Sequence, residues 1–124
     1  MFVYADNAAT TSVSKAALDA MLPYLTENYG NPSSLYRFAR IATDALAEAR
    51  ATVAACIGAE PREIYFTSGG SEADNQAIRS AAKLGARKGK KHIISTTFEH
   101  HAVLHTLDRL VKDGYEVTLL DVHE

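Results

Sequence analysis

The sequence predicts an α/β fold with a partial, mostly parallel sheet and crossover helices. Two observations support this fold class. In the second half of the chain, short apolar runs of strand length alternate with longer amphipathic runs of helix length. Such alternation is typical of parallel strands joined by right-handed crossover helices. The composition agrees, because 47% of the 124 residues are hydrophobic and 23% are charged, as in ordinary globular chains.

Charge and composition exclude several classes of function. The net charge of -2 leaves no basic footprint for nucleic acid or for an anionic membrane surface. One cysteine makes no internal disulfide, and no cysteine cluster indicates a zinc site. No apolar run is long enough to span a bilayer, and the first residues lack the basic region of a signal peptide. We therefore expect a cytoplasmic protein.

The first half of the chain is expected to hold an arm and two helices. Residues 1–13 show neither helical nor strand periodicity and are interpreted as an amino-terminal arm. Residues 14–58 contain the helices: the first begins after the N-cap Ser14 and is kinked or shortened by Pro23. The second runs from Leu35 to Ile57 with an apolar residue every three or four positions, and Gly58 ends it.

The second half, residues 59–124, is expected to form three strands and two helices. Strands are predicted over residues 63–67, 92–96 and 115–120, with helices over residues 72–84 and 103–112 between them. The second of these helices presents its apolar residues inward: Val103, Leu104, Leu107, Leu110 and Val111. No linker divides the chain, so residues 1–124 are expected to belong to one domain.

Residues 67–75, TSGGSEADN, carry the strongest local signal for chemistry. A predicted strand leads through two glycines into a helix, with Ser71 expected as the N-cap and Asp74 reaching back to it. Free amides at a helix start attract anions, so phosphate is the expected guest. A plain strand-to-helix turn is the alternative. The stretch is neither a dinucleotide fingerprint nor a P-loop.

A second signal is Glu99-His100-His101, which follows the strand predicted over residues 92–96. Ligands of open α/β sheets bind at the carboxyl ends of strands, so a histidine there can stack on a ring or move protons. The alternative is a solvent-facing histidine pair at a helix start. His101 and His105 share a helix face, but no third ligand matches their spacing, and no metal site is predicted. Cys56 is interpreted as a small buried residue beside the apolar stripe of its helix.

Four stretches, in this order and spacing, resemble the beginning of a cysteine desulfurase. These enzymes belong to the class V aminotransferase group of pyridoxal-phosphate enzymes of fold type I. The matching stretches cover nearly the whole chain: residues 4–11 (YADNAATT), 29–35 (YGNPSSL), 63–75 (EIYFTSGGSEADN) and 97–103 (TFEHHAV). Two local departures are Tyr36, where many members have histidine, and Ala39, where they often have glycine.

The resemblance implies a cofactor, a reaction and partners. In this family the Gly-Gly-Ser/Thr turn holds the phosphate of pyridoxal 5'-phosphate, which assigns Gly70 and Ser71 as cofactor-binding residues. The histidine after the glutamate stacks on the pyridine ring and moves protons, which assigns His100 to both cofactor binding and catalysis. The implied reaction takes sulfur from L-cysteine, leaves alanine and an enzyme persulfide, and supplies iron–sulfur clusters or thiolation. The implied partners are a sulfur-acceptor protein and a second copy in a homodimer.

The resemblance also implies that essential parts lie elsewhere. In the family the lysine that binds the cofactor covalently, the aspartate beside the pyridine nitrogen and the persulfide cysteine all come later in the sequence. Residues 1–124 are therefore expected to be a single incomplete domain, an amino-terminal fragment of the cofactor domain that is inactive by itself. The family fold places strand 64–67 far from the two strands that follow. Two alternatives stay open: another class V enzyme, such as a selenocysteine lyase, and a non-catalytic assembly module.

Overall fold

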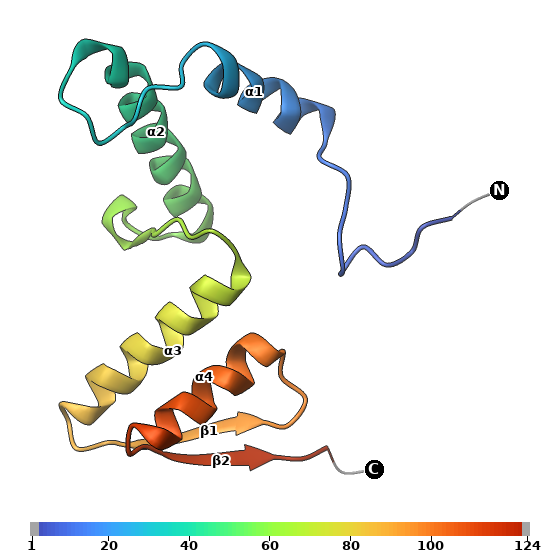
Figure 1. Ribbon diagram of the computed structural model, residues 1–124, viewed down its shortest axis with the longest axis vertical. Helices are drawn as coiled ribbons and strands as arrows, with labels where there is room; N and C mark the ends of the chain where they lie inside the picture. Colours follow the sequence, from blue (N-terminus) through green and yellow to red (C-terminus); the bar gives the residue numbers. More distant parts are fainter. Residues whose placement is uncertain (1–2, 123–124) are drawn as a thin grey trace. The chain divides into compact units, whose positions relative to one another are not determined.

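The computed structural model describes residues 3–122 and divides the chain into two compact units, Met1–Tyr65 and Phe66–Glu124 (Figure 1). The first unit is helical, and the second unit combines two helices with a small sheet. Within the described range, no helix is both long and apolar enough to cross a membrane.

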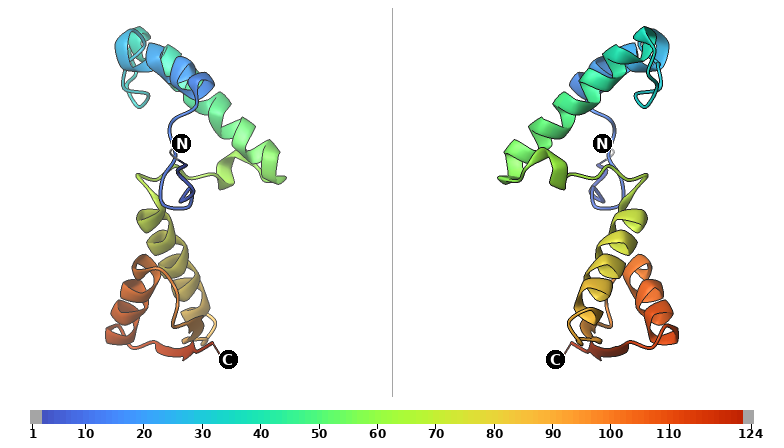
Figure 2. Two further views of the ribbon diagram at one scale, coloured as in Figure 1. Left: turned by 90° about the vertical axis from the view of Figure 1, so that its right-hand side faces the viewer. Right: turned by 90° about the vertical axis from the view of Figure 1, so that its left-hand side faces the viewer.

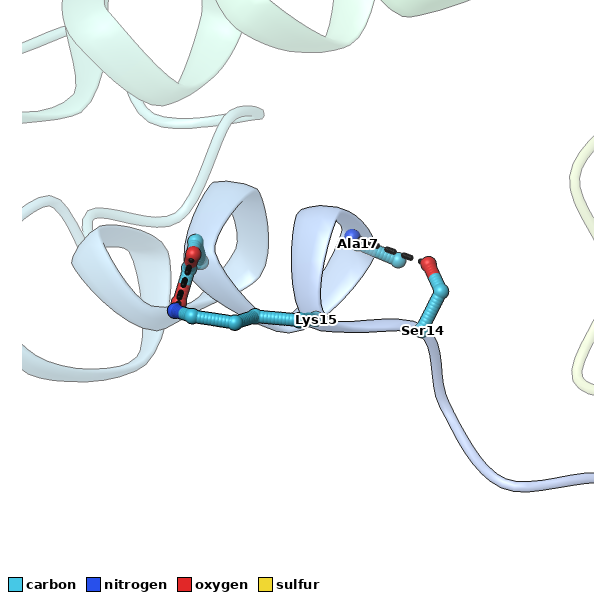
Figure 3. A network of polar contacts seen from close by, with 4 residues as sticks. Ser14, Lys15 and Ala17 are labelled. Carbon is cyan, nitrogen blue, oxygen red and sulfur yellow. Dashed lines mark hydrogen bonds and ion pairs between the residues drawn. The ribbon is translucent and has the colours of Figure 1, made fainter.

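Helix α1 (Lys15–Thr26) begins where the sequence predicts. The Ser14 hydroxyl accepts a hydrogen bond from the Ala17 N–H at 3.2 Å, so Ser14 is the N-cap (Figure 3). An exposed ion pair between Lys15 and Asp19 follows on the first turn. Pro23 lies inside α1, and its carbonyl accepts from the Glu27 and Asn28 N–H groups as the helix ends. The helix therefore continues for three residues beyond the proline.

Helix α2 (Arg40–Ile57) is the long predicted helix, and it starts five residues later than predicted. The expected start at Leu35 is wrong because a turn held by Asn31 and then a short 3-10 helix, η1 (Arg37–Ala39), precede it. The predicted end is confirmed. Gly58 has φ 67°, and its N–H bonds the Ala54 and Ala55 carbonyls, which is the left-handed helix end that glycine favours.

The second unit contains α3 (Gly70–Ala86), β1 (His92–Thr96), α4 (His101–Lys112) and β2 (Glu116–Leu120). The two strands pair in parallel, with His92 opposite Glu116 and Thr96 opposite Leu120. A parallel pair joined through α4 confirms the predicted α/β class. Helices α3 and α4 pack against each other, and Figures 1 and 2 show that both helices begin at the same end of this pair.

The strand predicted over residues 63–67 is absent. A second 3-10 helix, η2 (Pro61–Glu63), includes the first residue of the predicted strand, and residues 64–67 belong to no strand. Ile64 is extended, with φ -93° and ψ 125°, so the local backbone preference was read correctly. A strand also requires a neighbour to accept and donate its hydrogen bonds, and the described residues supply none at this place.

The core is small and sits mainly in the second unit. Leu107 and Leu110 of α4 are 3% and 4% exposed, which confirms two of its predicted inward residues, whereas Val111 is 52% exposed. The apolar stripe of α2 is largely exposed, with Ile57 at 68%. Cys56 is also exposed, so the expectation of a buried thiol is wrong. No described element packs over this stripe closely enough to bury it.

Candidate functional site

The first turn of α3 presents a row of unpaired donors. Across residues 3–122, no acceptor binds the N–H groups of four consecutive residues, which run from Gly69 to Glu72. The Ser71 hydroxyl is likewise without a hydrogen bond inside this range. Four unpaired N–H groups and the positive end of the helix dipole make this turn suited to a phosphate-sized anion.

The predicted capping of α3 is wrong in its details. Ser71 lies inside the helix, and Gly69 is the N-cap without a side-chain bond. The bridging carboxylate belongs to Glu72 instead of Asp74. Its Oε2 accepts from both the N–H and the hydroxyl of Ser68, each at 2.7 Å. The hydroxyl bond and then the backbone bond from Ser68 lower the pKa of Glu72 below its ordinary 4.5.

The glycines of the turn differ from the other glycines of the chain. A Cβ at Gly30 would lie 2.7 Å from the Phe38 carbonyl oxygen, and one at Gly85 would lie 3.0 Å from that of Lys90. The remaining three outside the turn have positive φ: Gly58, Gly89 and Gly114. In contrast, a Cβ at Gly69 or Gly70 would meet nothing within 4 Å. The described chain itself therefore gives no steric reason for glycine at these two positions.

His100 is the N-cap of α4, and the helix begins at His101, two residues before the predicted start at Val103. Its Nδ1 accepts from the Ala102 N–H at 3.1 Å. Because Nδ1 is an acceptor in this arrangement, the neutral ring carries its proton on Nε2. The preceding loop is fixed as well, since the Thr96 hydroxyl donates to Glu99 Oε1 at 3.0 Å. His100 is exposed, so its Nε2 edge is available to a ligand.

One side chain connects the two halves of the candidate site. Asn75 Nδ2 donates to the Ser71 carbonyl at 2.9 Å and reaches the Ala102 carbonyl of α4 at 3.5 Å. The turn that begins α3 and the turn that begins α4 are thereby joined through α3's second turn. The Gly-Gly turn and His100 therefore lie at the same end of this α/β unit.

The other histidines within residues 3–122 form no metal centre. His101 and His105 face each other with ring centroids 5.6 Å apart, as their spacing predicts, and His105 lies 3.8 Å from Asp108. In the part of the chain that the structure describes, no three histidine, cysteine, aspartate or glutamate residues are placed to hold one ion.

Sequence reasoning missed Ser68, Glu72 and Asn75 as structural parts of the site. The signal for Glu72 was present, because an acid in the first turn of a helix commonly bonds a backbone N–H ahead of it. Asp74 was predicted instead because it lies three residues after Ser71, the spacing of a capping box. Asn75 gave no such signal, because its link to α4 joins residues 27 positions apart.

The fold and the site together define a class of protein. The model for the family "Aminotransferase class-V" matches residues 3–124, and the chain belongs to this family. The predicted resemblance to cysteine desulfurases is confirmed. The chain is 54% identical over 120 residues to "Cysteine desulfurase IscS" of Methanosarcina thermophila and 48% identical over 122 residues to "Putative cysteine desulfurase IscS 1" of Bacillus subtilis.

Coverage is strongly unequal in these comparisons. The two relatives are matched over 97% and 98% of this chain but over only 30% and 32% of their own lengths. The chain thus spans about 30% of the length of the curated relatives it matches, in their amino-terminal region.

Solved structures show the same likeness. A "NIFS-LIKE PROTEIN" has a TM-score of 0.87 at 38% identity, covering 97% of this chain and 33% of that one. A second structure, "SspA in complex with cysteine", has a TM-score of 0.81 at 39% identity, covering 91% and 32%. The similarity therefore extends over about one third of each of these larger proteins.

Proposed function

We propose that this chain is the amino-terminal part of a pyridoxal-phosphate-dependent cysteine desulfurase and supplies the phosphate-binding half of its cofactor site. The observation that carries the proposal is the turn at residues 69–72. It combines four unpaired N–H groups with two glycines that the chain's own packing does not require. A ligand that approaches the backbone closely gives both features a reason.

The residues present fit the phosphate of pyridoxal 5'-phosphate. Gly70 and Ser71 offer N–H donors at the positive end of α3, and Ser71 adds a hydroxyl with no competing bond among the described residues. The open space at Gly69 and Gly70 admits the phosphate oxygens to hydrogen-bonding distance. When bound, the cofactor supplies an electron sink for chemistry at the amino acid's carbon atoms.

His100 takes the second role in this proposal. Its Nδ1 is bound to the Ala102 N–H, which fixes the plane of the ring and leaves Nε2 as the free nitrogen. A ring held in this way can lie against the cofactor's pyridine ring while its Nε2–H donates a hydrogen bond. To take a proton at Nε2, the ring first releases the Ala102 N–H and carries its own proton on Nδ1. The bond from Asn75 to Ala102 keeps the start of α4 against α3, and so keeps His100 on the same side as the phosphate turn.

Other parts of the proposed function come from the relatives. A structural neighbour described as a complex with cysteine supports cysteine as substrate. Alanine and an enzyme persulfide are the products in this proposal, as the resemblance to cysteine desulfurases implies. Because the chain spans about 30% of its relatives, the covalent lysine and the persulfide cysteine belong to the remaining length of such a protein. The proposal includes a homodimer, a sulfur-acceptor protein serving iron–sulfur cluster assembly or thiolation, and residues 1–124 as part of one larger domain. The proposal keeps the cytoplasm, the location expected from the sequence.

A chimera tests the proposed function. The chain is joined to the part of the Methanosarcina thermophila relative that lies beyond the matched region, and alanine formation from L-cysteine is measured. We expect activity, and we expect His100→Ala to reduce kcat by about 100-fold, the lower end for a lost acid–base group. His105→Ala is the matched control, because His105 is an exposed histidine of the same helix. A folded chimera that takes up the cofactor but forms no alanine would contradict the reaction.

A further inference from the structure

We propose that Glu72 is a positioning residue of the phosphate-binding turn: its carboxylate bridges back to Ser68 and restrains the backbone that carries the unpaired amides of residues 69–72. This inference rests on the proposed function and deepens it. It concerns a side chain that makes no contact with the phosphate in the proposal and acts through the backbone.

The bridge encloses the flexible part of the turn. Glu72 Oε2 receives two hydrogen bonds from Ser68, each at 2.7 Å, and the two residues lie on either side of Gly69 and Gly70. Glycine has the largest backbone freedom of any residue, so two in succession lose the most entropy when a ligand orders them. A bridge that orders them in advance reduces this cost on binding. The Thr67 hydroxyl, which donates to the Gly69 carbonyl at 3.2 Å, adds a second restraint on the same peptide.

The negative charge of Glu72 must be kept away from a phosphate bound at the turn. It is the acidic residue of α3's first turn, where a carboxylate is stabilised by the helix dipole but repels a phosphate. In the structure the charge is bonded to Ser68, ahead of the four amides, instead of to the amides themselves. The bridge therefore keeps the carboxylate from competing with a phosphate for the same N–H groups.

Two conservative substitutions separate the bridge from the charge. Glu72→Asp keeps the charge but is one methylene shorter and does not reach Ser68. Glu72→Gln keeps the length and an acceptor oxygen but removes the charge. We expect Glu72→Asp to raise the Kd for pyridoxal 5'-phosphate about tenfold, the equivalent of about 1.4 kcal/mol. We expect Glu72→Gln to bind as tightly as the parent chain or more tightly.

The measurement follows the backbone amides of Gly70 and Ser71 in the isotope-labelled chain during titration with pyridoxal 5'-phosphate, with inorganic phosphate and with pyridoxal. The two phosphate ligands should lose affinity in Glu72→Asp, whereas pyridoxal, which has no phosphate, should not respond to the substitution. Glu48→Asp is the matched control, because Glu48 is an exposed glutamate of α2 outside the turn. The Ser68 amide signal reports in each variant whether the bridge itself is present.

The outcomes distinguish this inference from the proposed function. A parent chain whose turn ignores both phosphate ligands contradicts the proposed function. A parent chain that binds them while Glu72→Asp binds equally well overturns the role of Glu72 alone. Equal losses in Glu72→Asp and Glu72→Gln would also overturn it, because the bridge would then not be the cause.

Discussion

The two units of the chain bury very different residues. The second unit buries Leu107, Leu110 and Thr106 of α4 together with Ala82 of α3. The first unit buries only small residues within its described part: Gly30, Ala39 and Ala54. Both units have amphipathic helices, but only the second has a sheet and a neighbouring helix against which large side chains pack. The difference shows that an apolar stripe predicts which face of a helix is suited to burial. It does not predict that another element of the same chain packs against that face.

The largest expected effect contrasts leucines of the two units. Leu107→Ala removes a side chain that is 3% exposed, so it should lower the free energy of unfolding of the second unit by about 2–5 kcal/mol. Leu22→Ala in α1 removes a side chain that is 51% exposed and should cost less than about 1 kcal/mol. Amide hydrogen exchange across α4 and β1 measures the first effect, and exchange across α1 the second. Equal losses of unfolding free energy in the two variants would mean that the Leu22 side chain of α1 is buried in solution.

A smaller effect contrasts glycines of the two units. Gly30→Ala places a Cβ 2.7 Å from a backbone oxygen, and we expect a cost of about 1–3 kcal/mol in the first unit. Gly70→Ala meets nothing within 4 Å and should change stability by less than about 0.5 kcal/mol. The same substitution should weaken phosphate binding, because its Cβ occupies the open space beside the amides. Thermal unfolding together with a phosphate titration tests both statements, and a strong destabilisation by Gly70→Ala would refute them.

The smallest effect is the titration of Glu72. Its pKa is lowered in the folded chain, so the bridge to Ser68 should persist above the ordinary value of 4.5 and be lost only as the pH falls through the lowered pKa. The chemical shift of the Ser68 amide should change with pH as Glu72 titrates, and this pH dependence should be absent in Glu72→Gln. A midpoint at or above 4.5 would be inconsistent with the bridge.

Much of the second unit could be predicted from sequence, because its signals are local. The strand at 92–96 is found with its predicted bounds, and α4 ends at Lys112 as predicted. The strand at 63–67 could not be predicted correctly from its composition, because pairing depends on a neighbour that the described chain does not contain. The Leu35 start of the long helix failed for a local reason, since the Asn31 turn competes with the helix.

The candidate site shows the same division. The Gly-Gly turn and His100 are local sequence signals, and both lie at helix starts in the structure. The capping partner was misassigned because Glu72 and Asp74 compete for one role, and spacing alone does not decide between them. The Asn75 link joins separate helices and becomes visible only in three dimensions.

The most direct test of the central claim is a titration of the isotope-labelled chain with pyridoxal 5'-phosphate, observed at every backbone amide. We predict saturable shifts at Gly69, Gly70, Ser71 and His100, with much smaller shifts in α1 and α2. Pyridoxal without its phosphate should leave the three turn amides unchanged. A folded chain in which those amides do not respond, or respond no more than the exposed amides of α1, would contradict the assignment of this turn as the phosphate-binding half of the site.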